Sequence, residues 1–198
     1  LVRSYGMLET VAGNGAGQTE GVSYWQEWFE GWPASWASLS RPHFAMADRA
    51  GNIYIADKNS HSVLRVDPEG TIHTPGGNHL GGFDGDGPAL ATTMSLQFPN
   101  GLWVQGVGTV HVLDTKNGRV RRIGTNQVMQ TLFLATPDGE ALRGGRGLWV
   151  NEAETLAYRE TNFEGDALVE TLIRGAADRL NPGGSLQLLT NWAILDEP

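Results

Sequence analysis

The stretch GNIYIADKNSHSVLRV (residues 51–66) returns with the same pattern as GTVHVLDTKNGRVRRI (residues 108–123), 57 residues later. In both copies apolar and polar residues alternate up to an aspartate, Asp57 or Asp114, and a second alternating run follows a short polar segment. Alternation with a period of two is the pattern of a half-buried β-strand. The two copies therefore predict a repeated pair of β-strands.

A third copy lies 46 residues beyond the second, because Gly-Leu-Trp-Val occupies residues 101–104 and again residues 147–150. Asp114 and Glu160 correspond at the same spacing. Four short strands fit in each copy, and they are expected at residues 43–48, 52–57, 62–66 and 71–74, then 102–105, 109–114, 119–123 and 128–133, then 148–151, 155–160, 168–174 and 185–190. Four antiparallel strands repeated about every 45 residues are typical of propeller blades.

The segments that flank these copies look like parts of further blades. Residues 7–12 are similar to the fourth strand of the first copy and are expected to form the outer strand of a preceding blade. Residues 195–198 repeat a Leu-x-x-Pro sequence and are expected to begin a next blade. Residues 1–198 thus predict a single propeller region with about three full blades plus a leading outer strand. Further sequence of the same polypeptide or neighbouring chains would complete the ring, and the isolated chain is not expected to be a stable monomer.

Two segments that precede a first strand share a second motif. They read ASWASLSRP (residues 34–42) and ATTMSLQFP (residues 91–99). Small and apolar residues at these spacings predict a short helical turn buried between blades. The proline is then expected to begin the innermost strand, at a position that donates no ladder hydrogen bond.

Together these motifs resemble the NHL-repeat family of β-propellers. The resemblance rests on LETVAGNG (8–15), GNIYIAD (51–57), GFDGDGPA (82–89) and the spacing Asp-x-x-Asn-x-x-Val-Arg in residues 114–121. It extends over about residues 7–162, and the third copy departs from it with Glu160 in place of the aspartate. The resemblance implies a propeller of four-stranded blades and, from the habit of bacterial members, an extracytoplasmic location, periplasmic or secreted.

Composition excludes several classes of protein. The chain of 198 residues has 14 basic and 22 acidic residues, a net charge of −8 and a sequence pI near 5.0. Such a surface argues against a nucleic-acid partner, which requires a basic footprint. No apolar run approaches the roughly 18–20 residues of a membrane span, so membrane insertion is not expected. The absence of cysteine excludes disulfides, thiolate-bound metals and thiol nucleophiles.

The most unusual segment is YWQEWFEGWPASW (residues 24–36), which holds four of the seven tryptophans. Their steps of 3, 4 and 4 residues predict a common helical face, although Pro33 must interrupt the helix. The segment lies in an apparent insertion at residues 20–36. It is expected either to cap the blade edge and bury its own rings, or to bind a protein partner, a neighbouring subunit or a glycan. The candidate binding residues are Trp25, Trp28, Phe29, Trp32 and Trp36.

Motifs for catalysis or metal binding are sparse. Asp84 and Asp86 are candidate metal ligands, and loop geometry is the favoured interpretation of the pair. Asp57 and Asp114 could face a solvent channel and hold a metal together with Asn117, but they are expected to accept backbone N–H hydrogen bonds, as aspartates do in Asx turns. The five histidines show no metal-ligand spacing, and Gly-x-Ser-x-Gly and Walker motifs do not occur. No catalytic residue and no cofactor are assigned.

Two functions remain for this sequence. The first is a non-enzymatic binding or scaffolding propeller that mediates protein–protein interaction within a larger assembly. The alternative is a metal-dependent propeller hydrolase or lyase with its site in the central channel, as in propeller lyases that hold zinc there.

Overall fold

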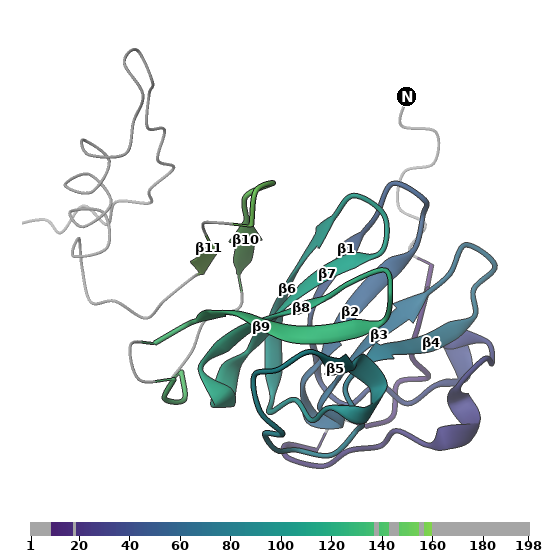
Figure 1. The fold of residues 1–198 in the computed structure, drawn as a ribbon. Coiled ribbons are helices and arrows are strands. Elements are labelled where there is room, and N and C mark those ends of the chain that lie inside the picture. Colours follow the sequence, from purple (N-terminus) through teal and green to yellow (C-terminus); the bar gives the residue numbers. More distant parts are fainter. Residues whose placement is uncertain (1–8, 18, 137–138, 143–146, 155–156, 160–198) are drawn as a thin grey trace, which may run out of the picture. The chain divides into compact units, whose positions relative to one another are not determined.

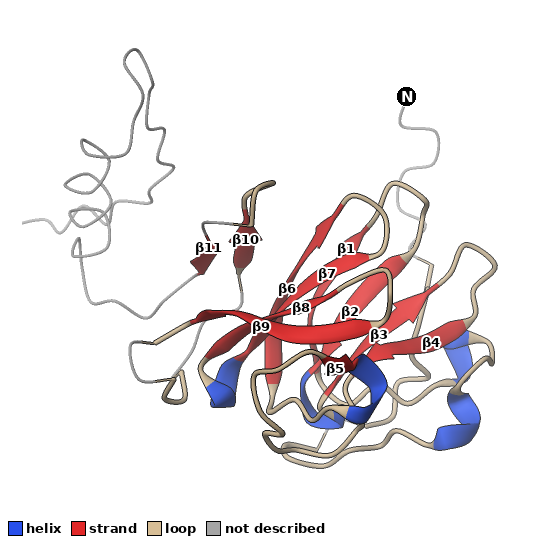
Figure 2. Ribbon diagram, viewed as in Figure 1, coloured by secondary structure: helices blue, strands red, loops and turns tan. Residues whose placement is uncertain are grey.

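The structure is a computed structural model, and it describes residues 9–17, 19–136, 139–142, 147–154 and 157–159. Within these ranges every regular element is a β-strand or a single turn of 3-10 helix, so the fold is all-β (Figure 2). The described strands form antiparallel sheets of four, five and two strands. The strands expected at 168–174 and 185–190, the residue Glu160 and the segment 195–198 lie outside the described residues.

The first sheet has the order β1-β2-β3-β4 and is antiparallel throughout (Figure 1). Its strands are β1 (Pro42–Ala47), β2 (Ile53–Asp57), β3 (Ser62–Val66) and β4 (Ile72–Gly76). Each lies within two residues of the position that the alternating pattern predicts. The tight turns between them follow from sequences such as Asp48-Arg49-Ala50-Gly51, in which the Asp48 carboxylate accepts the backbone N–H groups of Ala50 and Asn52.

The second sheet repeats this order and adds a short outer strand from the preceding linker, giving β5-β9-β8-β7-β6. Its strands are β5 (Ala89–Leu90), β6 (Pro99–Gln105), β7 (Thr109–Asp114), β8 (Arg119–Ile123) and β9 (Val128–Leu134). Both β1 and β6 begin with the expected proline. The first sheet has the counterpart of β5 in a single bridge between Pro33 and Thr71.

The third copy is described only in part, as the antiparallel pair β10 (Leu148–Val150) and β11 (Ala157–Arg159). Residues 9–12, the described part of the expected leading outer strand, belong to no strand. A β-strand requires a neighbour to accept and donate its ladder hydrogen bonds, and no described strand pairs with these residues.

Apolar side chains from adjacent sheets form the core. Tyr54, Ala56 and Val63 of the first sheet pack against Leu102 and Val112 of the second. Strands β1 and β2 lie against β6 across this junction, and β6 in turn contacts β10. Consecutive antiparallel sheets that pack face to face have a propeller-like arrangement.

The aspartate at the end of the second strand fastens the linker to each sheet. The backbone N–H of Ser40 donates to both carboxylate oxygens of Asp57 at 2.8 and 2.9 Å, and the N–H of Gln97 donates to Asp114 Oδ1 at 2.7 Å. Burial raises the pKa of both Asp57 and Asp114 to about 6. The expected backbone hydrogen bonds are confirmed, but these donors lie 17 residues earlier, in the linker, rather than in the aspartate's own turn.

The linker motif forms the expected short helical turns, η2 (Ala34–Trp36) and η4 (Ala91–Thr93). Ala34 and Ala91 are fully buried, and so is Leu96, which packs in the junction between the two sheets. Small side chains at these positions allow the turn to approach the sheet closely. Within the described residues, no helix is long and apolar enough to cross a membrane.

Candidate functional site

The tryptophan-rich segment lies in the first linker, which we define as residues 13–41, and it runs along the outer edge of the first sheet. Gly31 N–H donates to Ile72 O at 2.9 Å, and Ile72 N–H donates to Trp32 O at 2.9 Å. Ala34 N–H donates to Gly70 O at 2.8 Å. The linker therefore covers the edge strand β4, whose backbone groups would otherwise be open to pairing with another chain.

This edge pairing determines the local structure of the segment. Two separate 3-10 turns, η1 (Glu27–Phe29) and η2, are joined by a turn at residues 30–31 and a single bridge from Pro33 to Thr71. The expectation of a common helical face for the tryptophans is therefore wrong. Pro33 has no N–H to continue a helix, and its neighbours use their backbone groups to bond to β4 instead.

The tryptophan-rich segment lies where the first linker is longer than the second. Asn14 Nδ2 donates to Ser38 Oγ at 2.9 Å in the first linker, and Asn78 Nδ2 donates to Ser95 Oγ at 3.0 Å in the second linker, which we define as residues 77–98. Ala34 lies 20 positions after Asn14, and Ala91 lies 13 positions after Asn78. The first linker is thus seven residues longer over a span that includes Trp25, Trp28 and Trp32.

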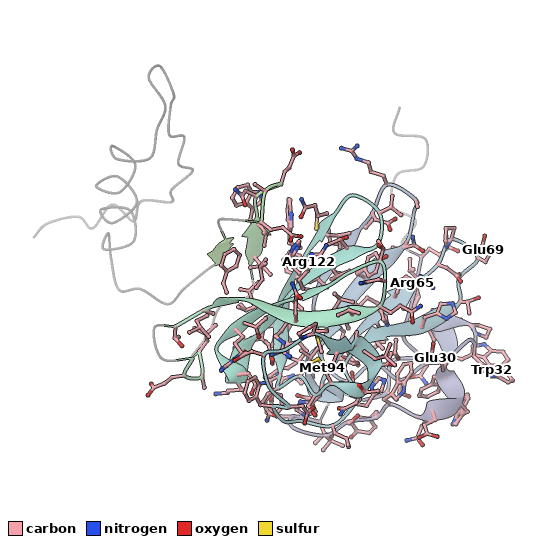
Figure 3. All side chains as sticks on the ribbon, in the orientation of Figure 1. Glu30, Trp32, Arg65, Glu69, Met94 and Arg122 are labelled. Atoms are coloured by element: carbon pink, nitrogen blue, oxygen red, sulfur yellow. The ribbon has the colours of Figure 1, made fainter. Side chains whose placement is uncertain are left out.

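Three indole rings of the insertion and its turn lie on the surface and contact one another. Trp28, Trp32 and Trp36 are 55%, 46% and 54% exposed. The Trp28 and Trp32 ring centroids are 6.2 Å apart, and those of Trp32 and Trp36 are 5.6 Å apart. Figure 3 shows Trp32 at the periphery of the ribbon. We call these three residues the tryptophan surface.

The other two candidate residues support this surface from below. Phe29 is only 3% exposed, packs in a cluster with Ile72 and lies 4.2 Å from the Trp28 ring centroid. Trp25 is half-buried and stacks on the His79 imidazole, with centroids 4.6 Å apart and planes 3° apart. Burial lowers the pKa of His79 to about 4, so at neutral pH Trp25 stacks on a neutral ring. Of the five candidates, the structure therefore brings three to the surface.

Asp84 and Asp86 hold the second linker in place. Asp84 Oδ2 accepts the backbone N–H of Ser95 at 2.6 Å, while Asp86 Oδ1 accepts Arg119 Nε and Thr131 Oγ1, both at 2.6 Å. These hydrogen bonds lower the pKa of both carboxyl groups. In the part of the chain that the structure describes, no group of three or more His, Asp or Glu side chains is placed to hold a metal ion.

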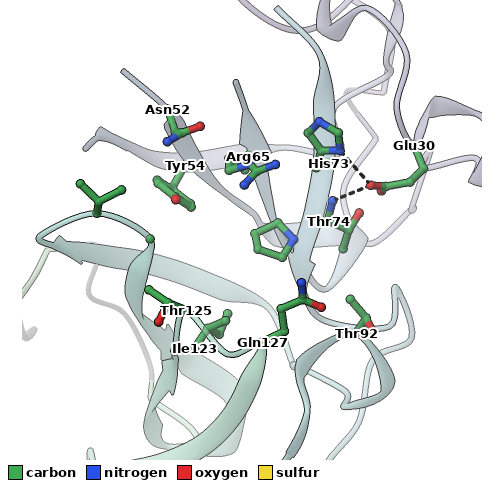
Figure 4. Close-up of a pocket in the computed structure, with 14 residues that line it drawn as sticks. Glu30, Asn52, Tyr54, Arg65, His73, Thr74, Thr92, Ile123, Thr125 and Gln127 are labelled. Carbon is green, nitrogen blue, oxygen red and sulfur yellow. Dashed lines mark hydrogen bonds and ion pairs between the residues drawn. The ribbon is translucent and has the colours of Figure 1, made fainter. Parts of the chain in front are cut away.

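A second surface feature was not foreseen from the sequence. A cleft of about 450 Å³ opens between the first sheet and the turns of the second, and Figure 4 shows its polar lining. Tyr54 and Arg65 line it from β2 and β3, and Thr125 and Gln127 line it from the turn between β8 and β9. We call it the inter-blade cleft. A comparison of the repeats could have indicated it, because Gly108 stands where the third copy has Glu154.

No family model and no curated protein sequence matches this chain. Solved structures do match it. One is a protein of unknown function from Bacteroides thetaiotaomicron VPI-5482, with 17% identity, a TM-score of 0.49, and 63% of this chain and 34% of that chain covered. Another is an auxiliary nutrient binding protein from the same organism, with 13% identity, a TM-score of 0.44 and coverage of 58% and 33%. A third is a streptogramin B lyase, with 11% identity, a TM-score of 0.43 and coverage of 63% and 42%. The chain spans about a third to two fifths of the length of these proteins.

Proposed function

We propose that the protein is a non-enzymatic binding propeller of the NHL type, in which the tryptophan surface holds a protein partner within a larger assembly. A ring completed by further polypeptide or by a neighbouring subunit, and an extracytoplasmic location, belong to the same proposal. They are supported by the repeat motifs rather than by the contacts described above.

One observation carries the proposal: Trp28, Trp32 and Trp36 keep about half of their surface in water although buried residues beside them already anchor the segment. Phe29 and Ala34 fill the core, so the edge of the sheet is covered without the three indoles. Contiguous exposed aromatic surface of this kind is what protein interfaces use, because tryptophan supplies a large contact area at a low cost in side-chain entropy.

The relative orientation of the rings favours a protein over a glycan. The Trp28 and Trp32 planes are 89° apart, and those of Trp32 and Trp36 are 36° apart. A sugar ring stacks on a flat aromatic face, whereas tilted rings present edges and faces in several directions. The uneven surface formed by these tilted rings is complementary to the pockets of a folded partner.

Site-specific photo-cross-linking tests this proposal. A benzoylphenylalanine replaces Trp32 in the full chain, and in a matched control it replaces Glu69, an exposed residue of the β3–β4 turn in the same sheet. In an extract of the native source we expect a discrete polypeptide adduct from position 32. Excess unlabelled protein should abolish it, and excess protein with Trp28→Ala, Trp32→Ala and Trp36→Ala should not.

Two results would contradict the proposal. An adduct that forms equally from position 69, or that the triple variant removes as well as the wild type does, would show that the tryptophan surface does not select the partner. An adduct that is removed by glycosidase treatment or by soluble oligosaccharides would identify the ligand as a glycan.

A further inference from the structure

The inter-blade cleft contains a cation without a carboxylate partner. Arg65 extends from β3 into the cleft, next to Tyr54 on β2 and His73 on β4, which are its neighbours across the sheet (Figure 4). Among the described residues no carboxylate forms an ion pair with Arg65. The Nε atom of Arg65 is buried and has no hydrogen-bond partner among the described residues. A buried donor of a charged group without a partner is costly, and a ligand that accepts from it would remove that cost.

The acids around the cleft, Asp48, Glu30 and Asp67, are engaged elsewhere. Asp48 accepts hydrogen bonds from the backbone N–H and Nδ2 of Asn52 and from Tyr54 Oη, which lies at 3.3 Å. Glu30 Oε1 accepts the Thr74 N–H at 3.2 Å and lies 3.4 Å from His73 Nδ1. Asp67 accepts the Thr71 N–H at 2.8 Å and lies 3.0 Å from His73 Nε2. The Thr71 hydrogen bond is the main reason that the pKa of Asp67 is lowered, and the Arg65 charge adds only a minor contribution. These contacts orient the Glu30 and Asp67 carboxylates toward backbone N–H groups and His73.

The next junction between repeats contains the same arginine with a partner. Arg122 stands one repeat after Arg65, and its Nε donates to Glu154 Oε1 at 2.7 Å. His111, which corresponds to Tyr54, lies 3.1 Å from the same oxygen through its Nε2. Hydrogen bonds from Arg122 and His111 lower the pKa of Glu154 against the effect of its burial. A carboxylate from the neighbouring turn therefore neutralises this second arginine.

The turn at the first junction lacks that carboxylate because Gly108 occupies the equivalent position. Gly108 and Glu154 share the left-handed backbone conformation, with φ of 82° and 55°. A Cβ atom on Gly108 would lie 4.0 Å from Tyr54 Oη and 3.3 Å from Thr125 Cγ2, so a side chain there would enter the cleft. The space that the Glu154 side chain fills at one junction is thus left open beside Arg65 at the other.

We propose that the inter-blade cleft binds a small hydroxylated carboxylate, whose carboxylate group pairs with Arg65 as Glu154 pairs with Arg122. A guanidinium matches a carboxylate in geometry, with charge-assisted hydrogen bonds that are shorter and stronger than neutral ones. The hydroxyl of Thr125 and the amide of Gln127 supply donors and acceptors for the hydroxyls of the ligand, and Thr74, whose Oγ1 lies 3.1 Å from His79 Nε2, has remaining hydrogen-bonding capacity. The volume of about 450 Å³ accommodates a ligand of sugar-acid size. This site is separate from the tryptophan surface and does not depend on the proposed function.

Amide chemical-shift titrations of the full chain test the proposal with glucuronate as the probe and glucose as its neutral control. We expect glucuronate to shift the signals of Thr74, Thr125 and Gln127 saturably and to bind at least about tenfold more tightly than glucose. Glucose 6-phosphate distinguishes the two sources of negative charge, and tighter binding of the phosphate would overturn the assignment of a carboxylate. Failure of glucuronate to shift these signals would overturn the site itself.

Four variants assign the effect to the cleft. Arg65→Gln should weaken glucuronate binding about tenfold or more, while Arg49→Gln, which removes a positive charge from an exposed turn, should leave it unchanged. Gly108→Glu should abolish binding by supplying the missing carboxylate. Gly108→Ala carries the same backbone strain without the charge and should retain binding. Equal losses in Arg65→Gln and Arg49→Gln, or full binding in a folded Gly108→Glu variant, would contradict the proposal.

Discussion

The two linkers share one hydrogen-bond framework and differ in what they add to it. Gly13 N–H donates to Ala34 O in the first linker, and Gly77 N–H donates to Ala91 O in the second, both at 3.0 Å. An asparagine, a 3-10 turn and an aspartate clamp follow in both linkers. The framework thus tolerates seven additional residues between the asparagine and the turn.

What differs is how the two linkers are covered. The second linker buries Ala91, Met94 and Leu96 between two described sheets, while its preceding part leaves Leu80, Phe83 and Leu90 exposed. In the first linker, the insertion folds over the first sheet and covers its apolar side chains with Phe29 and Trp25. An element that faces solvent on one side can carry exposed rings, because burial of its other side already holds it in place.

The largest expected effect separates the anchor of the insertion from its surface. Phe29→Ala should lower the free energy of unfolding by about 3–5 kcal/mol, because the buried ring leaves a cavity. Trp32→Ala, its exposed neighbour, should cost about 1 kcal/mol or less. Urea denaturation followed by circular dichroism measures both. Equal losses would mean that the tryptophan surface is part of the core.

The next effect compares the linkers directly at equivalent leucines. Leu96→Ala should cost about 2–5 kcal/mol, because Leu96 is fully buried between sheets. Leu39→Ala should cost less than half as much, because Leu39 is only partly buried. The same denaturation experiment measures both variants. A loss below about 0.5 kcal/mol for Leu96→Ala would show that the linker does not stabilise the junction.

The pH dependence of stability tests the clamp that both linkers share. Asp57 and Asp114 have a native pKa of about 6 against 3.8 in the unfolded chain, so the native state binds more protons between these values. The stability they contribute is present at low pH and is lost as the pH rises through 6. Lowering the pH from 7 to 5 should therefore raise the stability of the wild type over that of Asp57→Asn/Asp114→Asn by about 1 kcal/mol for each carboxyl group.

The measurement compares the unfolding free energies of the wild type and the double variant, because His79 also contributes to the pH dependence. Burial lowers the pKa of His79 to about 4, which opposes the effect of the aspartates as the pH falls, but this contribution is common to both proteins. A difference in unfolding free energy that stays constant between pH 7 and 5 would show that the clamps do not titrate in this range.

The smallest effect concerns the asparagine at the beginning of each framework. Asn14→Ala and Asn78→Ala each remove a side-chain hydrogen bond to a serine, at 2.9 and 3.0 Å, and should each cost about 1 kcal/mol. Thermal denaturation of the two variants under identical conditions measures the costs. A large difference between the costs of the two variants would mean that the tryptophan-rich segment changes the hydrogen-bond framework of the first linker and not only the side chains that cover it.

Much of the fold could be predicted because its signals are local. Alternation placed β1–β4 and β6–β9 within a few residues, and the prolines marked the beginnings of β1 and β6. The aspartate contacts were predicted only in kind. Asp57 accepts backbone N–H groups as expected, but the Ser40 donor belongs to a distant segment, and no local pattern specifies that pairing.

The sequence singled out the tryptophan-rich segment but did not predict the conformation that the segment adopts. The spacing of Trp28, Trp32 and Trp36 suggested one helical face, whereas hydrogen bonds to the edge of the first sheet divide the segment into two separate 3-10 turns. Which of the rings became buried followed from contacts with the first sheet. The spacing of aromatic residues along the chain carries no information about those contacts.

The sequence by itself determined the repeat, the strand positions of the first two copies and the linker turns, because each depends on residues that are close in the chain. Only the tertiary structure decided that Phe29 is buried while Trp32 is exposed, and that Arg65 faces an open cleft beside Gly108. These outcomes depend on which surfaces of separate repeats meet. Burial and charge pairing arise from contacts between the repeats. Side chains more than forty residues apart in the chain make such contacts only after the sheets have packed.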